Sequence, residues 1–467
     1  MSGSEVDSDD SQGIHLLVLI HGMWGNPSHL AEMRRIMEEK RGQPDSERGP
    51  QGERLQILLA ETNRDDGTYD GIDWGGERVA EEIFEEVKKL EKDGKKVTRF
   101  SVTGYSLGGL IARYVVGILH QRGFFENVTP VNFNTLATPH IGLPRYRTFV
   151  SGVFAFLGPK LLSRTGEQFY VVDKWSKNGR PLLEVMADPN RIFYQALTRF
   201  EQVRFYANAV NDVTVPYVTA AIELEDPFLE HAFNGIKIEF DEKYSPILKS
   251  YTPSTVVEPR PKPRVFTPQW FKSLKPERPL LPPALQFAFP FNILLILSTP
   301  ILIPLVLSLV ITRFALASRA SRARIKLLEK DSEQSNTERL VHVIGRLERE
   351  MEAVAVDMLD APGSSYDVES SQPPLSTATP AALADAEAEL DAAARTQAEQ
   401  KQDLVLADVQ KKIVGWLNTL PGLKKELAFI HPVRNSHAVI ISRDVKRFPG
   451  HKQGEGVLRH WADHFII

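Results

Sequence analysis

The chain lacks cysteine altogether, since none occurs among its 467 residues. This absence excludes a disulfide framework, a catalytic thiolate and any metal site with cysteine ligands. A strong excess of charge is missing as well, because 56 basic and 60 acidic residues give a formal net charge of −4. The sequence also has no zinc-ligand spacing and no nucleic-acid motif, so we expect no nucleic acid as a partner.

The first residues lack the basic and apolar pattern of a secretory signal, because MSGSEVDSDDSQ is acidic. Ser2 follows Met1 at the position where N-myristoylation requires glycine. We therefore expect a protein that faces the cytosol and is not secreted. Any contact with a membrane would then come from within the chain.

The first half of the chain alternates short β-forming runs with helical periodicity. This alternation predicts an α/β fold with a mostly parallel sheet flanked by helices. A helix is expected from about Asp73, where apolar side chains recur three and four residues apart. The expected strands are rich in branched and aromatic residues and cover 15–20, 55–60, 97–102, 131–136 and 203–210.

The segment GYSLG, residues 104–108, is the strongest functional signal. It directly follows an expected strand and opens an apolar helix, LGGLIARYVVGILH. This is the arrangement of a nucleophile elbow, in which small residues two before and two after the serine permit a tight bend and expose the hydroxyl. Ser106 is therefore the expected nucleophile.

A second glycine-containing turn, HGMWG at residues 21–25, ends the first expected strand. Hydrolases with a nucleophile elbow take one oxyanion-binding N–H from this position and another from the residue after the serine. We therefore expect the backbone N–H groups of Met23 and Leu107 to form the oxyanion hole. An ordinary turn between a strand and a helix is the alternative.

A serine nucleophile needs a base and a carboxylate that orients the base, and in this fold the chain order is serine, acid, histidine. Asp212 follows the expected strand VRFYANAV and should lie beside the elbow at the carboxyl edge of the sheet. An Asx turn that caps the strand end is the alternative role. Glu184, Asp188 and Asp226 have no comparable position.

The same chain order selects the histidine. His437 follows the acid, in the loop after the expected strand LAFIHPV, and is the expected base. His140 precedes the acid and is expected to shape a turn or the pocket, while His231 follows no convincing strand. The other candidates lie within an expected strand or near a closing helix, and they are His431, His451, His460 and His464.

An uncharged run, FNILLILSTPILIPLVLSLVIT, lies between the acid and the base. A single membrane crossing there would place His437 on the opposite side from Ser106. Pro300 and Pro304 each remove a helix hydrogen bond near the middle of the run. We therefore expect residues 284–318 to form a bent hairpin in one membrane leaflet or a lipid surface, with a buried core helix as the alternative.

The remaining segments around this run are polar or of low complexity. Residues 245–283 are rich in proline and predict an extended linker. Residues 319–360 predict an amphipathic helix, whose apolar stripe over 340–358 would pack on its own protein or bind a partner helix. Residues 361–402 are expected to be disordered, because they carry almost no large apolar side chain, and 403–467 should complete the core.

Six segments together resemble a fungal serine esterase and lipase family that includes lipid-droplet phospholipases. They are HGMWG, VTGYSLGGLIARY, LATPHIG, NDVTVPY, NSHAVIISRD and GVLRHWADHF. The hydrolase core is expected at residues 12–230 and 403–467, and the resemblance covers roughly the first 220 and the last 65 residues. It implies an α/β-hydrolase with a triad of Ser106, Asp212 and His437, acting on glycerophospholipids or related acylglycerols.

These observations predict a lipid acyl-ester hydrolase that needs no cofactor and no metal. We expect a phospholipase at a lipid droplet or at the cytosolic leaflet of a membrane. A mono- or diacylglycerol lipase and a membrane scaffold without activity are the alternatives. A cap over the acyl pocket is expected at residues 140–200, where RTFVSGVFAFLGPKLL would supply an apolar helix at the interface.

Overall fold

The computed structural model describes residues 12–42, 48–229, 231–253, 267, 291–334 and 404–467. Its centre is a six-stranded sheet in the order β10-β6-β4-β3-β1-β2, and all neighbouring strands are parallel. The five strands expected in the first half are therefore confirmed. The strands are β1 (Gln12–Ile20), β2 (Arg54–Leu59), β3 (Lys95–Tyr105), β4 (Thr129–Leu136), β6 (Gln202–Asn208) and β10 (Leu423–Ala428).

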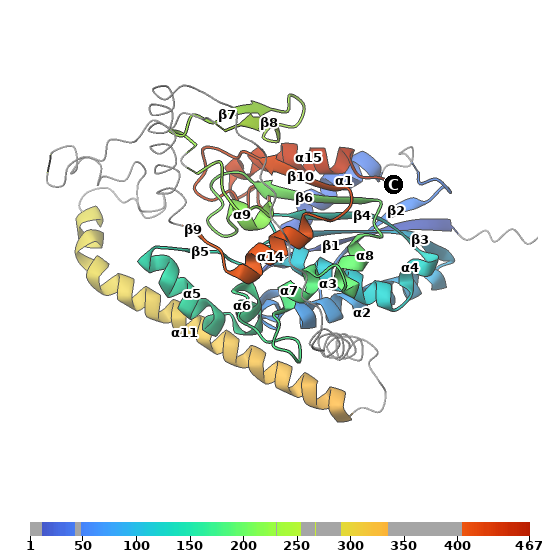
Figure 1. Cartoon of the computed structure of the whole chain (residues 1–467), viewed down its shortest axis with the longest axis horizontal. Coiled ribbons are helices and arrows are strands. Elements are labelled where there is room, and N and C mark those ends of the chain that lie inside the picture. The colour runs from blue at the N-terminus through green and yellow to red at the C-terminus, as the bar shows by residue number, and fades with distance from the viewer. Residues whose placement is uncertain (1–11, 43–47, 230, 254–266, 268–290, 335–403) are drawn as a thin grey trace, which may run out of the picture.

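Helices cover both faces of the sheet (Figure 1). Alternate residues of β1 enter two different cores: Leu16 packs with α2 and α3, whereas Leu17 packs with α1 and α15. A parallel sheet buried on both faces needs such strands, which are apolar throughout. The helices are α1 (Ala31–Arg41) and α15 (Glu455–Asp463) on one face, and α2 (Ile72–Lys92), α3 (Leu107–Gln121) and α8 (Ile192–Leu197) on the other.

The other elements are short or lie around this core. They are η1 (Pro27–Leu30), η2 (Asp65–Tyr69), α4 (Phe124–Asn127), β5 (Arg145–Tyr146), α5 (Phe149–Leu161), α6 (Ser163–Phe169), α7 (Leu182–Ala187), α9 (Tyr217–Ala220), β7 (Lys237–Phe240), β8 (Leu248–Thr252), β9 (Leu404–Val405), α14 (Asp408–Leu417) and η4 (Pro449–Gly454).

The expected cap at residues 140–200 is only partly separate from the core. Helix α8 packs on α3, and its residues Ala196 and Leu197 are fully buried. These apolar side chains therefore belong to the main helical layer. Helices α5 and α6 remain as the peripheral part of this region, next to the insertion (Figure 1).

The expected hairpin at residues 284–318 is wrong, because one continuous helix, α11 (Phe291–Gln334), runs through its described part. A proline deletes one hydrogen bond and bends the helix axis, but a reversal of direction requires a turn. No turn interrupts the helix at Pro300 or Pro304. Figure 1 shows α11 running along the side of the molecule beside α5.

The structure also changes what was expected for the segments on either side of this run. Residues 319–334 continue α11 and do not begin a separate amphipathic helix. Within the expected linker at 245–283, β8 pairs antiparallel with β7. The stripe at 340–358 and the segment 361–402 lie outside the described residues.

By length and composition, α11 contains a stretch that is apolar enough to cross a membrane, Pro300–Leu328. Its last part, however, contacts η2 and α6 of the core. The helix is thus attached to the core of the protein over part of its length.

Candidate active site

Ser106 occupies the sharp turn between β3 and α3. Its backbone angles, φ 56° and ψ −125°, are uncommon for any residue other than glycine. The turn is so tight that a side chain at Gly104 would collide with the backbone of Gly108, and one at Gly108 would collide with the Ile20 carbonyl. The glycines of GYSLG therefore permit the predicted nucleophile elbow.

The structure brings Ser106, Asp212 and His437 together. His437 Nε2 lies 3.0 Å from Ser106 Oγ, and His437 Nδ1 lies 2.9 Å from Asp212 Oδ2. The base and the acid are 225 positions apart in the chain. Because Nδ1–H donates to the carboxylate, Nε2 is left as the acceptor for the serine hydroxyl proton.

Asp212 performs both of the roles considered for it, one with each carboxylate oxygen. Oδ1 accepts hydrogen bonds from the N–H groups of Thr214 (3.0 Å) and Val215 (2.8 Å), which is the Asx turn. Oδ2 accepts from Asn208 Nδ2 (2.8 Å) and from the imidazole of His437 (2.9 Å). The turn therefore fixes the carboxylate that orients the base.

Two residues that the sequence analysis did not single out hold the histidine loop in place. The Tyr105 hydroxyl donates to the His437 carbonyl (2.9 Å), and burial raises the pKa of Tyr105, so the donor proton is retained. Ser436 Oγ donates to the Val210 carbonyl (2.8 Å), and Ser436 N–H donates to the Asn211 carbonyl (2.9 Å). The polar hydroxyl of Tyr105 at the end of an apolar strand was the available sequence signal.

The loop at residues 21–25 lies directly against the nucleophile. A Cβ atom placed on Gly22 would be 2.7 Å from Ser106 Cβ and 3.3 Å from Ser106 Oγ. Within the part of the chain that the structure describes, no acceptor is bonded to the Met23 N–H. Leu107 is the first residue of α3, where the N–H has no partner within the helix. The two predicted donors are therefore available beside Ser106 to bind an oxyanion.

The histidines that were set aside have other contacts. His140 is buried, its Nε2 lies 2.9 Å from Thr135 Oγ1, and its ring stacks on Phe205. His451 accepts a hydrogen bond from the Asp444 N–H (3.1 Å). Among the described contacts of these histidines, none reaches Ser106.

His460 and His464 lie at the end of the chain, and His460 contacts the sheet on the face that α1 and α15 cover. His460 Nδ1 lies 3.0 Å from the Tyr206 hydroxyl, and burial lowers the pKa of His460 to about 3. His464 donates to the His460 carbonyl (2.8 Å). These side chains therefore pack α15 against the sheet.

His431 does not lie within a strand, contrary to the expectation for LAFIHPV. Strand β10 ends at Ala428, because the Phe429 N–H donates to the Pro246 carbonyl (2.9 Å) and leaves the ladder. His431 is exposed in the following loop, and its ring lies 5.4 Å from that of His231.

The carboxylates that were set aside also have other partners. Glu184 accepts from Lys412 (2.8 Å), and Asp188 accepts from Arg180 (2.9 Å). Asp226 accepts from the Phe228 N–H (2.9 Å), and burial raises the pKa of Asp226 to about 6. None of these described contacts involves the imidazole of His437.

Two neighbouring helices expose large apolar side chains. On α5, Phe149 is 87% exposed and Phe154 is 63% exposed. On α11, Ile301 is 73% exposed and Leu305 is 53% exposed. We call these exposed residues of α5 and of the first half of α11 the apolar surface. Just past this half of α11, the ring of Phe314 stacks on Trp24 of the loop at residues 21–25, which we call the oxyanion loop.

The sheet, the elbow after β3, the acid after β6 and the histidine after β10 are those of an α/β-hydrolase, as predicted. Residues 10–222 match the family described as "Putative serine esterase (DUF676)".

Two curated fungal proteins illustrate the similarity. A "Putative lipase" of Schizosaccharomyces pombe is 31% identical over 218 residues, which are 46% of this chain and 27% of the relative. A "Putative lipase" of Saccharomyces cerevisiae is 28% identical over 243 residues, which are 50% of this chain and 32% of the relative. The matched region thus spans about a third or less of these relatives.

Solved structures that resemble the chain include hydrolases of low sequence identity. Phospholipase PlaB from Legionella pneumophila is 15% identical, with a TM-score of 0.27 over 44% of this chain and 40% of that chain. Est1E from Butyrivibrio proteoclasticus is 16% identical, with a TM-score of 0.24 over 45% of this chain and 73% of that chain.

Proposed function

We propose that this chain, whose residues 10–222 belong to the serine esterase family, is a lipid acyl-ester hydrolase. The single observation that carries the proposal is the triad geometry. One imidazole lies 3.0 Å from the Ser106 hydroxyl and 2.9 Å from the Asp212 carboxylate. A serine hydroxyl becomes a nucleophile when a base in this position can take its proton.

The chemistry follows from the positions of these groups. Ser106 Oγ attacks the ester carbonyl carbon while His437 Nε2 takes the hydroxyl proton, and Asp212 stabilises the imidazolium. The carbonyl oxygen becomes an oxyanion that the N–H groups of Met23 and Leu107 bind. His437 then returns the proton to the leaving alcohol, and a water molecule hydrolyses the acyl-enzyme by the same steps.

The apolar surface supports a lipid as the substrate. Exposed aromatic and aliphatic side chains lie on α5 and α11, and α11 reaches the oxyanion loop through the ring of Phe314. Each Leu or Phe that becomes fully buried in a lipid phase contributes about 1.5–3 kcal/mol of favourable transfer free energy. The names of the fungal relatives, which refer to lipases, point to the same substrate class.

Within this class we favour a phospholipase that acts on glycerophospholipids over a mono- or diacylglycerol lipase. Basic side chains on α11 support a surface that carries anionic headgroups. They are Arg313, Arg319, Arg322 and Lys326.

We place the enzyme on a lipid droplet or on the cytosolic leaflet of a membrane, with α11 lying along the surface. The later part of α11 is bonded to the core, so it stays on the same side as the triad. The preceding residues, 254–290, carry eight charged residues and many prolines, and they are unsuited to a second crossing. A helix in the interface plane satisfies both conditions.

The test compares the wild-type protein with Ser106→Ala. A fluorophosphonate probe should label only the wild type, and incubation with mixed phospholipids and acylglycerols should release fatty acid only with the wild type. Lysophospholipid among the products would identify a phospholipase, whereas glycerol or monoacylglycerol would identify an acylglycerol lipase.

The control is lipid binding, because Ser106→Ala removes one hydroxyl and leaves α11 unchanged. Both proteins should float with phosphatidylcholine and phosphatidylserine vesicles. Flotation of an unlabelled wild-type protein would mean a membrane scaffold, and a labelled protein that stays in solution would contradict the lipid surface.

A further inference from the structure

We infer that α11, besides meeting lipid, positions the oxyanion loop (residues 21–25) through Phe314, Ser321 and Arg324. This inference rests on the proposed function, because it assigns these residues to the esterase site. The link runs from α11 to η2 and from both to Trp24, the neighbour of Met23. These three residues act through other groups and do not touch the reacting atoms.

The first contact joins α11 directly to the oxyanion loop. The rings of Trp24 and Phe314 lie 5.6 Å apart and 2° from parallel. Trp24 has a φ of 52°, an uncommon conformation for a residue with a side chain, which persists only where the surroundings impose it. Because Trp24 follows Met23 in the same tight loop, the position at which Trp24 is held limits where the Met23 backbone can lie.

Helix η2 holds the same residue from the other side. The Trp24 N–H donates to Thr68 Oγ1 (3.1 Å), and the indole N–H donates to the Tyr69 hydroxyl (2.9 Å). The Asp65 N–H donates to the Gly25 carbonyl (3.0 Å). The oxyanion loop therefore follows any movement of η2.

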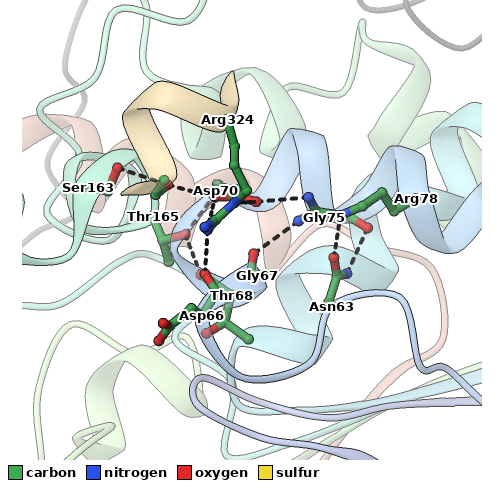
Figure 2. A network of polar contacts seen from close by, with 12 residues as sticks. Asn63, Asp66, Gly67, Thr68, Asp70, Gly75, Arg78, Ser163, Thr165 and Arg324 are labelled. Atoms are coloured by element: carbon green, nitrogen blue, oxygen red, sulfur yellow. Dashed lines mark hydrogen bonds and ion pairs between the residues drawn. The ribbon is translucent and has the colours of Figure 1, made fainter. Parts of the chain in front are cut away.

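Helix α11 in turn fixes the position of η2, as Figure 2 shows around Asp70. Arg324 Nη2 donates to the Asp66 carbonyl (2.9 Å) and to Asp70 Oδ1 (2.8 Å). Ser321 Oγ donates to Asp70 Oδ1 (2.6 Å), and Ser321 and Asp70 are both fully buried. Arg78 donates to the other carboxylate oxygen (2.8 Å), which connects the cluster to α2.

These contacts form a closed set: α11 holds η2, η2 holds Trp24, and Trp24 packs back on α11. A buried carboxylate that accepts from charged donors keeps its position, because the loss of any one donor raises the free energy of the folded protein. Weakening the contact with α11 should therefore disturb the oxyanion hole without altering the triad. Such a change lowers kcat, because the Met23 N–H stabilises the transition state and binds the ground state little.

The experiment measures hydrolysis of p-nitrophenyl butyrate, a water-soluble ester, in the absence of lipid. We expect Phe314→Ala and Arg324→Gln to lower kcat by about tenfold with KM within about twofold of the wild-type value, a smaller loss than removal of an oxyanion donor. Phe314→Tyr keeps the ring and should restore wild-type kcat. Arg34→Gln removes the same charge from an exposed position of α1 and should leave kcat unchanged.

Thermal unfolding of each variant separates positioning from loss of the fold. Phe314 is half-buried, so Phe314→Ala tests the inference even where Arg324→Gln proves unstable. Wild-type kcat in folded Phe314→Ala, or an equal loss in Arg34→Gln, would overturn the positioning role. A wild-type protein that neither hydrolyses the ester nor reacts with fluorophosphonate would overturn the proposed function itself, which is a different result.

Discussion

Asp212 and Asp70 are both buried carboxylates in loops beside the active site, yet their partners differ in kind. Asp212 accepts from a histidine, an asparagine and two backbone N–H groups. Asp70 accepts from two arginines and a serine. An imidazole can take up and return a proton, whereas a guanidinium keeps its charge at every accessible pH. The first arrangement therefore supports chemistry, and the second fixes structure.

The largest effect should come from Asp212→Asn. The amide disfavours the imidazole tautomer that accepts the serine proton, and we expect kcat to fall by about 10³–10⁴-fold. Rates of ester hydrolysis and of fluorophosphonate labelling measure this loss.

The matched control for this variant is Asp241→Asn. Asp241 makes the same kind of turn, because its Oδ1 accepts from the N–H groups of Lys243 (2.8 Å) and Tyr244 (3.0 Å), but it does not contact the triad. Its activity should equal that of the wild type. Similar losses in both variants would mean that Asp212 acts only through its turn.

Asp70→Asn should lower the stability of the folded protein. Neutralising the carboxylate leaves Arg78 and Arg324 without their anion, and the loss of a buried pair costs about 3–5 kcal/mol. Both arginines are partly exposed, with side-chain exposures of 25% and 40%. We therefore expect the free energy of unfolding to fall by about 2–3 kcal/mol, as measured by denaturant titration.

Asp66→Asn provides the comparison, because Asp66 lies in η2, the short helix that Asp70 directly follows. Its carboxylate lies 3.8 Å from an exposed arginine, Arg313, and exposed pairs contribute about 0–1 kcal/mol. Should Asp66→Asn and Asp70→Asn lower the free energy of unfolding equally, the buried Asp70 carboxylate would not be what holds these contacts together.

The smallest effect concerns Asp226, a half-buried carboxylate held by a backbone turn. Burial raises the pKa of Asp226 to about 6, above the value of about 3.9 in an unfolded chain. The folded protein binds this proton more tightly, so this group's contribution to stability falls as the pH rises from about 4 to about 6. Asp226→Asn keeps the oxygen acceptor and removes the penalty, so we expect a gain of about 1–2 kcal/mol at pH 7.

Thermal unfolding at pH 5 and pH 7 tests this sign. The gain from Asp226→Asn should be larger at pH 7, whereas Asp93→Asn, at an exposed position, should show no such difference. A larger gain at pH 5 would contradict the raised pKa.

The sequence was sufficient to predict the sheet and the triad because both depend on local signals and chain order. Strand ends place Ser106 and Asp212 at one edge of a parallel sheet. The order of the triad, together with a loop position after the last expected strand, selects His437 among twelve histidines. Close backbone contacts around Ser106 leave no room for a side chain at Gly104 or Gly108, and the motif GYSLG contains both glycines.

The contacts of α11 could not be predicted in the same way. Arg324 reaches Asp70 across 254 positions, and neither residue belongs to a motif. The prolines of α11 indicated a turn, but local propensity cannot show that the helix continues and docks on η2. The hydroxyl of Tyr105 was overlooked for the same reason, since its partner lies 332 positions away.

Strand β10 lies at the edge of the sheet and pairs with β6, and the loop after it carries His437. During synthesis, at about 5–20 residues per second, His437 leaves the ribosome about 10–45 s after Asp212. The nascent chain therefore carries the serine and the acid before it carries a base. The triad is in this way incomplete in the growing chain, and it forms only when the last strand joins the sheet.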